Sequence, residues 1–147
     1  MSANPERILK LILQITGGIM VMAIVAVFLP LDQMANIHQW LNLEKTEFPK
    51  TGIVDYLARS LSAFYVLMGM LYIVLARGIR VYAPVIAFVA WANIFFGLVT
   101  IWIDVRIKFP LWWTLGEGPF IVLFGVLILW LQRKVRKTPA EADDGMG

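Results

Sequence analysis

The chain has 147 residues, of which 60% are hydrophobic and 16% charged, and its mean hydropathy is +0.76. A soluble domain is closer to half apolar, so this composition argues against a soluble globular protein and favours a membrane protein. The net charge of +3 is small and cysteine is absent, which excludes disulfides, thiolate metal sites and iron–sulfur clusters held by this chain.

Four apolar runs are long enough to cross a bilayer. A hydrocarbon core about 30 Å thick needs about 20 apolar residues in a helix, and the runs at 11–29, 60–76, 81–103 and 118–132 contain no charged residue. They are continuous, unlike the short alternating segments of a barrel. The sequence predicts an all-α, polytopic membrane protein with one domain over residues 1–137. Its helices are expected at about 8–29, 53–76, 82–104 and 115–132, followed by a disordered cytoplasmic tail over 138–147.

The first run follows a short polar segment with Arg7 and Lys10. It is longer than the apolar part of a signal peptide and has no small-x-small cleavage pattern, so we expect a retained first helix. Its Gln14, Gly17 and Gly18 suit close contact with another helix, because small residues let backbones approach in lipid.

The connection after Pro30 contains a second kind of helix signal. Apolar residues recur at helical spacing from Met34 to Leu41, which predicts a short amphipathic helix lying in the membrane interface, with Asp32 as its cap. The polar stretch 44–52 contains Pro49 and Gly52 and predicts a turn.

The second and third spanning helices carry polar residues in regular positions. Asp55 and Arg59 are four residues apart, in the order of opposite charges that stabilises a helix. Asn93, Gly97, Thr100 and Asp104 form a polar stripe along the third helix. Asn93, near the middle of the span, is expected to form a hydrogen bond across helices. The alternative is that it lines a permeation path.

The segment before the fourth helix combines an aromatic girdle with a capping signal. Phe109, Trp112 and Trp113 are typical of the membrane interface. Thr114 and Glu117 match a capping box, with the helix beginning at Leu115. Pro119 could bend this helix.

The distribution of Lys and Arg predicts the orientation. Both chain ends and the turn at 77–80 together carry eight, and the two remaining connections carry five over a longer length. Because cytoplasmic loops are enriched in basic residues, both termini are expected in the cytoplasm of a bacterial inner-membrane protein. These residues lie at the ends of apolar runs, which argues against nucleic acid as a partner.

Arg59, Asp104 and Glu117 are all expected near the outer membrane boundary. One hypothesis is an ion pair between Arg59 and one of the two acids that locks the second, third and fourth helices together, because pairing lowers the cost of charge in a membrane. The other is an outward-facing polar pocket for a headgroup, an ion or a small ligand, in which Asp55, His38 and Asn93 could also take part.

Catalytic and cofactor motifs are absent from the sequence. It has no G-x-S-x-G elbow, P-loop or G-x-G-x-x-G in a strand-to-helix context. His38 is the only histidine, so a typical zinc site is not expected. His38 is expected to be an interfacial side chain, and a pH sensor is the alternative. The sequence therefore predicts no catalytic, cofactor-binding or metal residues.

Three segments carry a resemblance to a known group. Ile37–Leu41, Tyr56–Ser60 and Pro110–Pro119 resemble small four-helix bacterial integral membrane proteins of the DUF4345-like type. The likeness covers most of residues 30–132. It implies a bacterial inner-membrane setting and no established activity, ligand or catalytic residue.

The expected function is that of a non-enzymatic membrane protein, structural or accessory to a larger complex. The expected partners are the lipid bilayer and other membrane subunits or further copies of the chain. The alternative is a binder or carrier of a small solute or lipid at the outward-facing pocket between the second, third and fourth helices.

Overall fold

The computed structural model describes residues 4–41 and 49–137, and all regular structure in those ranges is helical. The predicted tail at 138–147 and most of the predicted turn at 44–52 lie outside the described residues. The helices are α1 (Pro5–Val21), α2 (Ile24–Phe28), α3 (Leu31–Trp40), α4 (Gly52–Leu75), α5 (Ala83–Ile107) and α6 (Leu111–Lys137).

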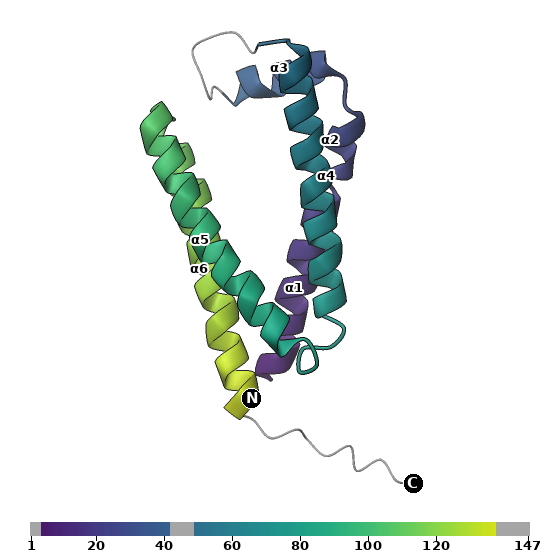
Figure 1. The fold of residues 1–147 in the computed structure, drawn as a ribbon, viewed down its shortest axis with the longest axis vertical. Coiled ribbons are helices and arrows are strands. Elements are labelled where there is room, and N and C mark those ends of the chain that lie inside the picture. The colour runs from purple at the N-terminus through teal and green to yellow at the C-terminus, as the bar shows by residue number, and fades with distance from the viewer. Residues whose placement is uncertain (1–3, 42–48, 138–147) are drawn as a thin grey trace.

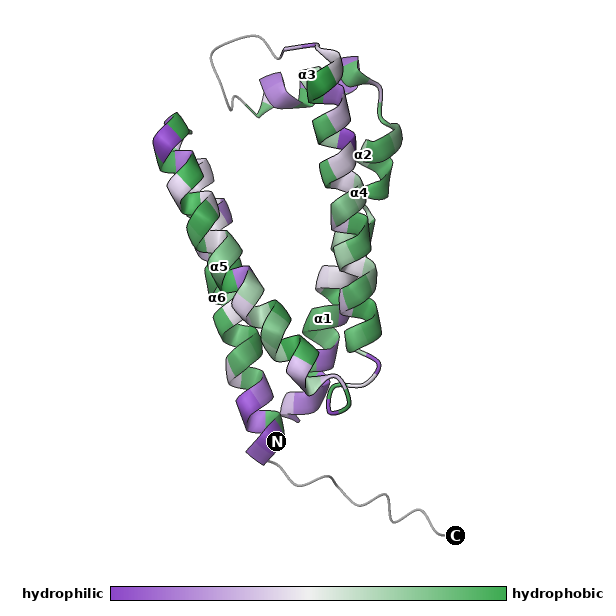
Figure 2. Ribbon diagram, in the orientation of Figure 1, coloured by the Kyte–Doolittle hydropathy of each residue, from purple (hydrophilic) through white to green (hydrophobic). Residues whose placement is uncertain are grey.

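Four helical segments are long and apolar enough to span a membrane, as the sequence predicts. They are Pro5–Phe28, which joins α1 and α2, and then α4, α5 and α6, with 24 to 27 residues each. Figure 2 shows that hydrophobic residues occupy the middle of these segments and hydrophilic residues gather toward their ends. The chain is therefore compatible with a multi-pass membrane protein.

The first span, Pro5–Phe28, agrees with the helix predicted at about 8–29, but its helical geometry is interrupted between α1 and α2. Met22 donates its backbone N–H to Gly18 and Ile19, and Ala23 donates to Met20, so the backbone changes to bonds three residues back. Three-residue bonding tightens the helix and ends the regular α1 geometry. The short α2 continues the span to Phe28.

The amphipathic segment predicted after Pro30 is present as α3, but Asp32 does not cap it. Pro30 occupies the cap position and no side chain caps the helix. Asp32 lies within the first turn, and its carboxylate binds Lys50 at 2.5 Å. Trp40 at the other end of α3 is 83% exposed, which places a large aromatic side chain on the surface.

The fourth spanning helix begins earlier than the capping box indicates. α6 starts at Leu111, directly after Pro110, and therefore includes Trp112 and Trp113. Thr114 is inside its first turn, with its hydroxyl 3.5 Å from the Pro110 carbonyl oxygen. The capping-box prediction is wrong because Pro110, with its fixed φ, already starts the helix one turn earlier.

The helices form two pairs, which we call the first pair (α1 with α4) and the second pair (α5 with α6). The extensive helix contacts are those within each pair, those of α2 with α4 and those of α1 with α6. Figure 1 shows the two pairs meeting where α1 begins and α6 ends, and diverging toward α3. We call these the terminal end and the loop end of the molecule.

Glycines set the spacing within each pair. A Cβ on Gly69 of α4 would lie 2.6 Å from the carbonyl oxygen of Gly17 of α1. A Cβ on Gly97 of α5 would lie 2.8 Å from the carbonyl oxygen of Gly118 of α6. Both distances are too short for a side chain, so each pair depends on backbones that touch directly. Gly17 thus fulfils the predicted contact, while Gly18 has open space around it.

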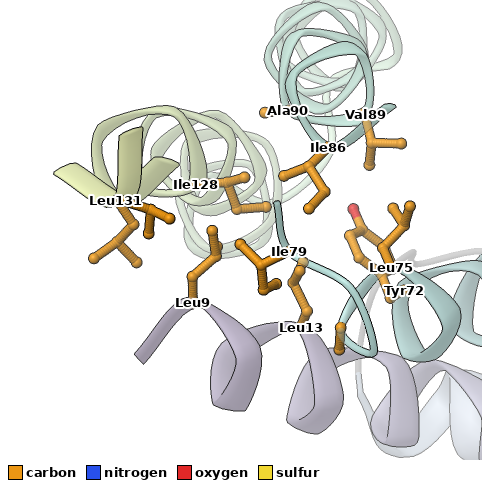
Figure 3. Close-up of a cluster of buried hydrophobic side chains, with 12 residues drawn as sticks. Leu9, Leu13, Tyr72, Leu75, Ile79, Ile86, Val89, Ala90, Ile128 and Leu131 are labelled. Carbon is orange, nitrogen blue, oxygen red and sulfur yellow. The ribbon is translucent and has the colours of Figure 1, made fainter. Parts of the chain in front are cut away.

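The apolar core lies at the terminal end. Leu9 and Leu13 of α1 pack in one cluster with residues from the end of α4, the following turn, the start of α5 and the end of α6. Figure 3 shows these side chains converging from all four spans. Beyond this cluster, toward the loop end, the only buried hydrophobic residue in the described part of the chain is Ala35. Among the described residues, the buried apolar packing between the two helix pairs is thus confined to the terminal end.

Candidate functional site

Arg59 binds within its own helix pair. Its Nε lies 2.8 Å from the Asp55 carboxylate, which confirms the predicted pair four residues apart. Its two other nitrogens donate to the carbonyl oxygens of Val27 and Leu29, the latter at 3.2 Å. The expected ion pair between Arg59 and Asp104 or Glu117 is not formed, so this hypothesis is wrong.

The position of α2 explains the choice of partners. The last carbonyl groups of a helix have no partner inside that helix, and α2 ends at Phe28 beside α4. Arg59 reaches these carbonyl oxygens, while the second helix pair diverges from α4 at this level (Figure 1). Arg59 therefore anchors the end of α2 to α4.

Replacing Arg59 with methionine is expected to destabilise the first helix pair. The change removes the charge-assisted bonds to Val27 and Leu29 and leaves Asp55 half-buried without its cation. The expected loss is about 1.5–3 kcal/mol of unfolding free energy, measured by circular dichroism during titration with a denaturing detergent.

Arg106→Met provides the matched control. The Arg106 guanidinium carbon lies 5.5 Å from the Trp102 ring centroid, and Arg106 is exposed near the end of α5. Its replacement is expected to change stability by less than about 0.5 kcal/mol. Equal losses in the two variants would mean that the bonds from Arg59 to α2 contribute nothing specific.

Asp104 is buried between the helices of the second pair. Its side chain is 3% exposed, and its Oδ2 has no hydrogen-bond partner in the described structure. Gly97 faces Gly118 and Val122 across the pair, and Ile101 contacts Gly118. Continuing this antiparallel register places Asp104 beside Thr114, which is also buried.

Glu117 lies on α6 and is half-buried. Its carboxylate accepts a hydrogen bond of 2.5 Å from Nε1 of Trp113, one turn earlier. Glu117 therefore finds its hydrogen-bond partner within its own helix.

Asn93 connects the two pairs near the middle of the membrane span. Its side-chain nitrogen donates to the Tyr72 hydroxyl of α4 at 2.6 Å and to the Val89 carbonyl oxygen at 2.8 Å. The predicted bond across helices is thus present. Tyr72 was not expected as its partner, although it is a hydrogen-bonding side chain in an otherwise apolar run.

The remaining candidate, His38, is half-buried in the last turn of α3. No group of three or more His, Cys, Asp or Glu side chains suited to a metal ion occurs within residues 4–41 and 49–137.

The candidate residues divide between the two helix pairs. Arg59 and Asp55 belong to the first pair, and Asp104 and Glu117 to the second. Tyr72 and Asn93 mark the faces that the pairs turn toward each other. Near the terminal end these faces touch, and toward the loop end they diverge. A nucleophile beside a general base is not found among the described residues.

Comparison with known proteins finds no matching family model, curated protein or solved structure.

Proposed function

We propose that this chain is a non-enzymatic accessory subunit of a membrane complex. It receives a transmembrane helix of another membrane protein, or of a second copy, between its diverging helix pairs. The observation that carries the proposal is the confinement of the apolar core to the terminal end. Helices in lipid gain stability mainly from close packing, and here α4 has no extensive helix contact with α5 or α6.

The carboxylate of Glu117 on α6 supports this proposal. Glu117 is half-buried and has one hydrogen bond, from Trp113. A carboxylate on a membrane helix is costly unless it faces the interior of a bundle and finds partners there. A helix placed between the pairs would provide such an interior and could donate a hydrogen bond to Glu117.

The proposed setting is the bacterial inner membrane with both chain ends in the cytoplasm. Because the chain has four candidate spans, the start of α1 and the end of α6 lie at the same end of the molecule (Figure 1). That end carries the excess of Lys and Arg, which is typical of the cytoplasmic side.

Photocrosslinking inside cell membranes tests the proposal. A photoreactive amino acid at Leu61 stands on the α4 face that carries Tyr65 and Tyr72, because positions four and seven apart share a face. At Leu67 it stands on the opposite side. The two leucines are 53% and 54% exposed, so the comparison differs mainly in the face that carries the probe.

The expected result is a protein adduct formed at Leu61 and not at Leu67. Adducts of Leu61 with α5 or α6 of the same chain would show that the pairs close on each other, and would overturn the proposal.

A second candidate function is a binder of a lipid or small polar solute at the same place. It is favoured by Glu117, a half-buried carboxylate whose hydrogen bond comes from Trp113 of its own helix. A lipid or small-molecule adduct at Leu61, with no protein adduct, would support this second function and contradict the first.

A further inference from the structure

The two ends of the molecule differ strongly in charge. In the described part of the chain the terminal end carries eight Lys and Arg side chains and one acidic side chain, Glu6. The loop end carries four basic and four acidic side chains. Both ends are hydrophilic in Figure 2, but among the described residues only the terminal end has a large net positive charge.

The fold places the basic side chains of α6 on one exposed surface. Gln132 and Val135 are buried, and the four residues Arg133, Lys134, Arg136 and Lys137 are exposed. With 100° between successive helical residues, these four lie on the arc opposite the buried side. The packing of α6 on the core therefore points the whole basic run outward.

α1 adds to the same positively charged region. Leu9 is fully buried in the cluster that also contains Leu131 and Val135, so the start of α1 is fixed beside the end of α6. Arg7 and Lys10, on either side of Leu9, are exposed. We define the basic end as these two side chains, the four basic side chains of α6, and Arg77 and Arg80 in the turn between α4 and α5.

Few of these charges are neutralised by acidic side chains of residues 4–41 and 49–137. Arg80 pairs with Glu6 at 2.9 Å, and the Lys134 ammonium lies 3.6 Å from the Trp130 ring centroid. Arg7, Lys10, Arg77, Arg133, Arg136 and Lys137 have no acidic partner within the described residues. Trp130 lies one turn before Lys134, and indole rings prefer the level of the lipid headgroups. The Lys134 ammonium is therefore expected close to that level, at the end of the apolar span.

We infer that the basic end binds the headgroups of anionic phospholipids in the adjacent leaflet. A cluster of four to eight Lys and Arg next to a spanning helix attracts negatively charged lipids. The occupant carries a phosphate and a net negative charge, lies in the plane of the membrane, and is therefore within reach of side chains fixed at the end of α1 and α6. This inference is independent of what lies between the helix pairs.

Native mass spectrometry of the purified full chain tests the inference. The protein is equilibrated in micelles with equal amounts of phosphatidylglycerol and phosphatidylcholine that have identical acyl chains. Since each nearby basic side chain contributes about fivefold to the attraction, the expected preference for phosphatidylglycerol is at least about tenfold. It should fall when the salt concentration rises from about 0.1 M to about 1 M, because screening shortens the range of the charges.

Charge removal at the two ends provides the matched comparison. The variant R133Q/R136Q/K137Q is expected to bring the lipid ratio close to one, and the loop-end variant R106Q/K108Q to leave it unchanged. R7Q/K10Q on α1 is expected to lower the lipid ratio partly. It replaces the first variant in the test if that variant loses its helical circular dichroism signal. The inference is overturned if the wild-type ratio is near one, or if removal at either end has the same effect. Complete displacement of phosphatidylglycerol by excess inorganic phosphate, or tighter binding of duplex DNA, would also overturn it.

Discussion

Replacing Gly97 with leucine is expected to separate the helices of the second pair and to give the largest loss of stability among single changes in α5. A Cβ at this position would lie 2.8 Å from the Gly118 carbonyl oxygen and 2.9 Å from the Val122 backbone nitrogen. These obstructing atoms belong to backbone and cannot rotate away. Inserting side-chain volume into a packed contact costs about 1–3 kcal/mol, and occasionally more. The measurement is the unfolding free energy in mixed micelles, followed by tryptophan fluorescence.

Gly116→Leu on α6 is the control for the intrinsic effect of the substitution. Gly116 is also helical, and a Cβ there would meet no atom within 4 Å. This variant is expected to be as stable as the parent or slightly more stable, because leucine favours a helix over glycine. If both glycine variants lost stability equally, close contact between α5 and α6 would not be the cause.

Shortening Leu9 to alanine is expected to weaken the joint between the two helix pairs. Leu9 is fully buried in the core cluster at the terminal end, which is where α1 contacts α6. Large-to-small changes in a packed core cost about 2–5 kcal/mol, and the low end of that range applies in lipid, where burial removes no contact with water. The unfolding midpoint in denaturing detergent measures this loss.

Leu11→Ala is the matched control in the same helix. Leu11 is 55% exposed and lies on the surface of α1 rather than in the cluster, so its loss is expected to be within about 0.5 kcal/mol. A loss at Leu9 no larger than that at Leu11 would contradict the assignment of the core to the terminal end.

The four spans were predictable because a bilayer requires uninterrupted apolar helices, and that requirement is visible in the composition of each run. The pair of Asp55 and Arg59 was predictable for a similar reason, since a spacing of four residues depends only on helical geometry. The sequence indicates less clearly which side of each helix contacts another helix. Gly17 and Gly18 are equally small, yet only Gly17 touches α4.

The errors concern choices between competing partners. Arg59 was expected to neutralise an acid on another span, but the unpaired carbonyl groups at the end of α2 are closer. Those carbonyl groups are unpaired because α2 ends at Phe28, shortly before Pro30. Likewise, Thr114 and Glu117 match a capping pattern, while Pro110 starts the helix earlier. Tertiary position decides the partners of Arg59, whereas the start of α6 is decided by two competing local signals, of which Pro110 prevails.

The core cluster holds the two helix pairs together near the terminal end, so each pair extends from that end toward the loop end. α5 has 25 residues, so it is about 37 Å long at 1.5 Å per residue, and a rotation of about 10° about its fixed end moves the other end by roughly 6 Å. Rotation of the helix pairs about the terminal end would change the width of the molecule at the loop end and leave it nearly constant at the terminal end.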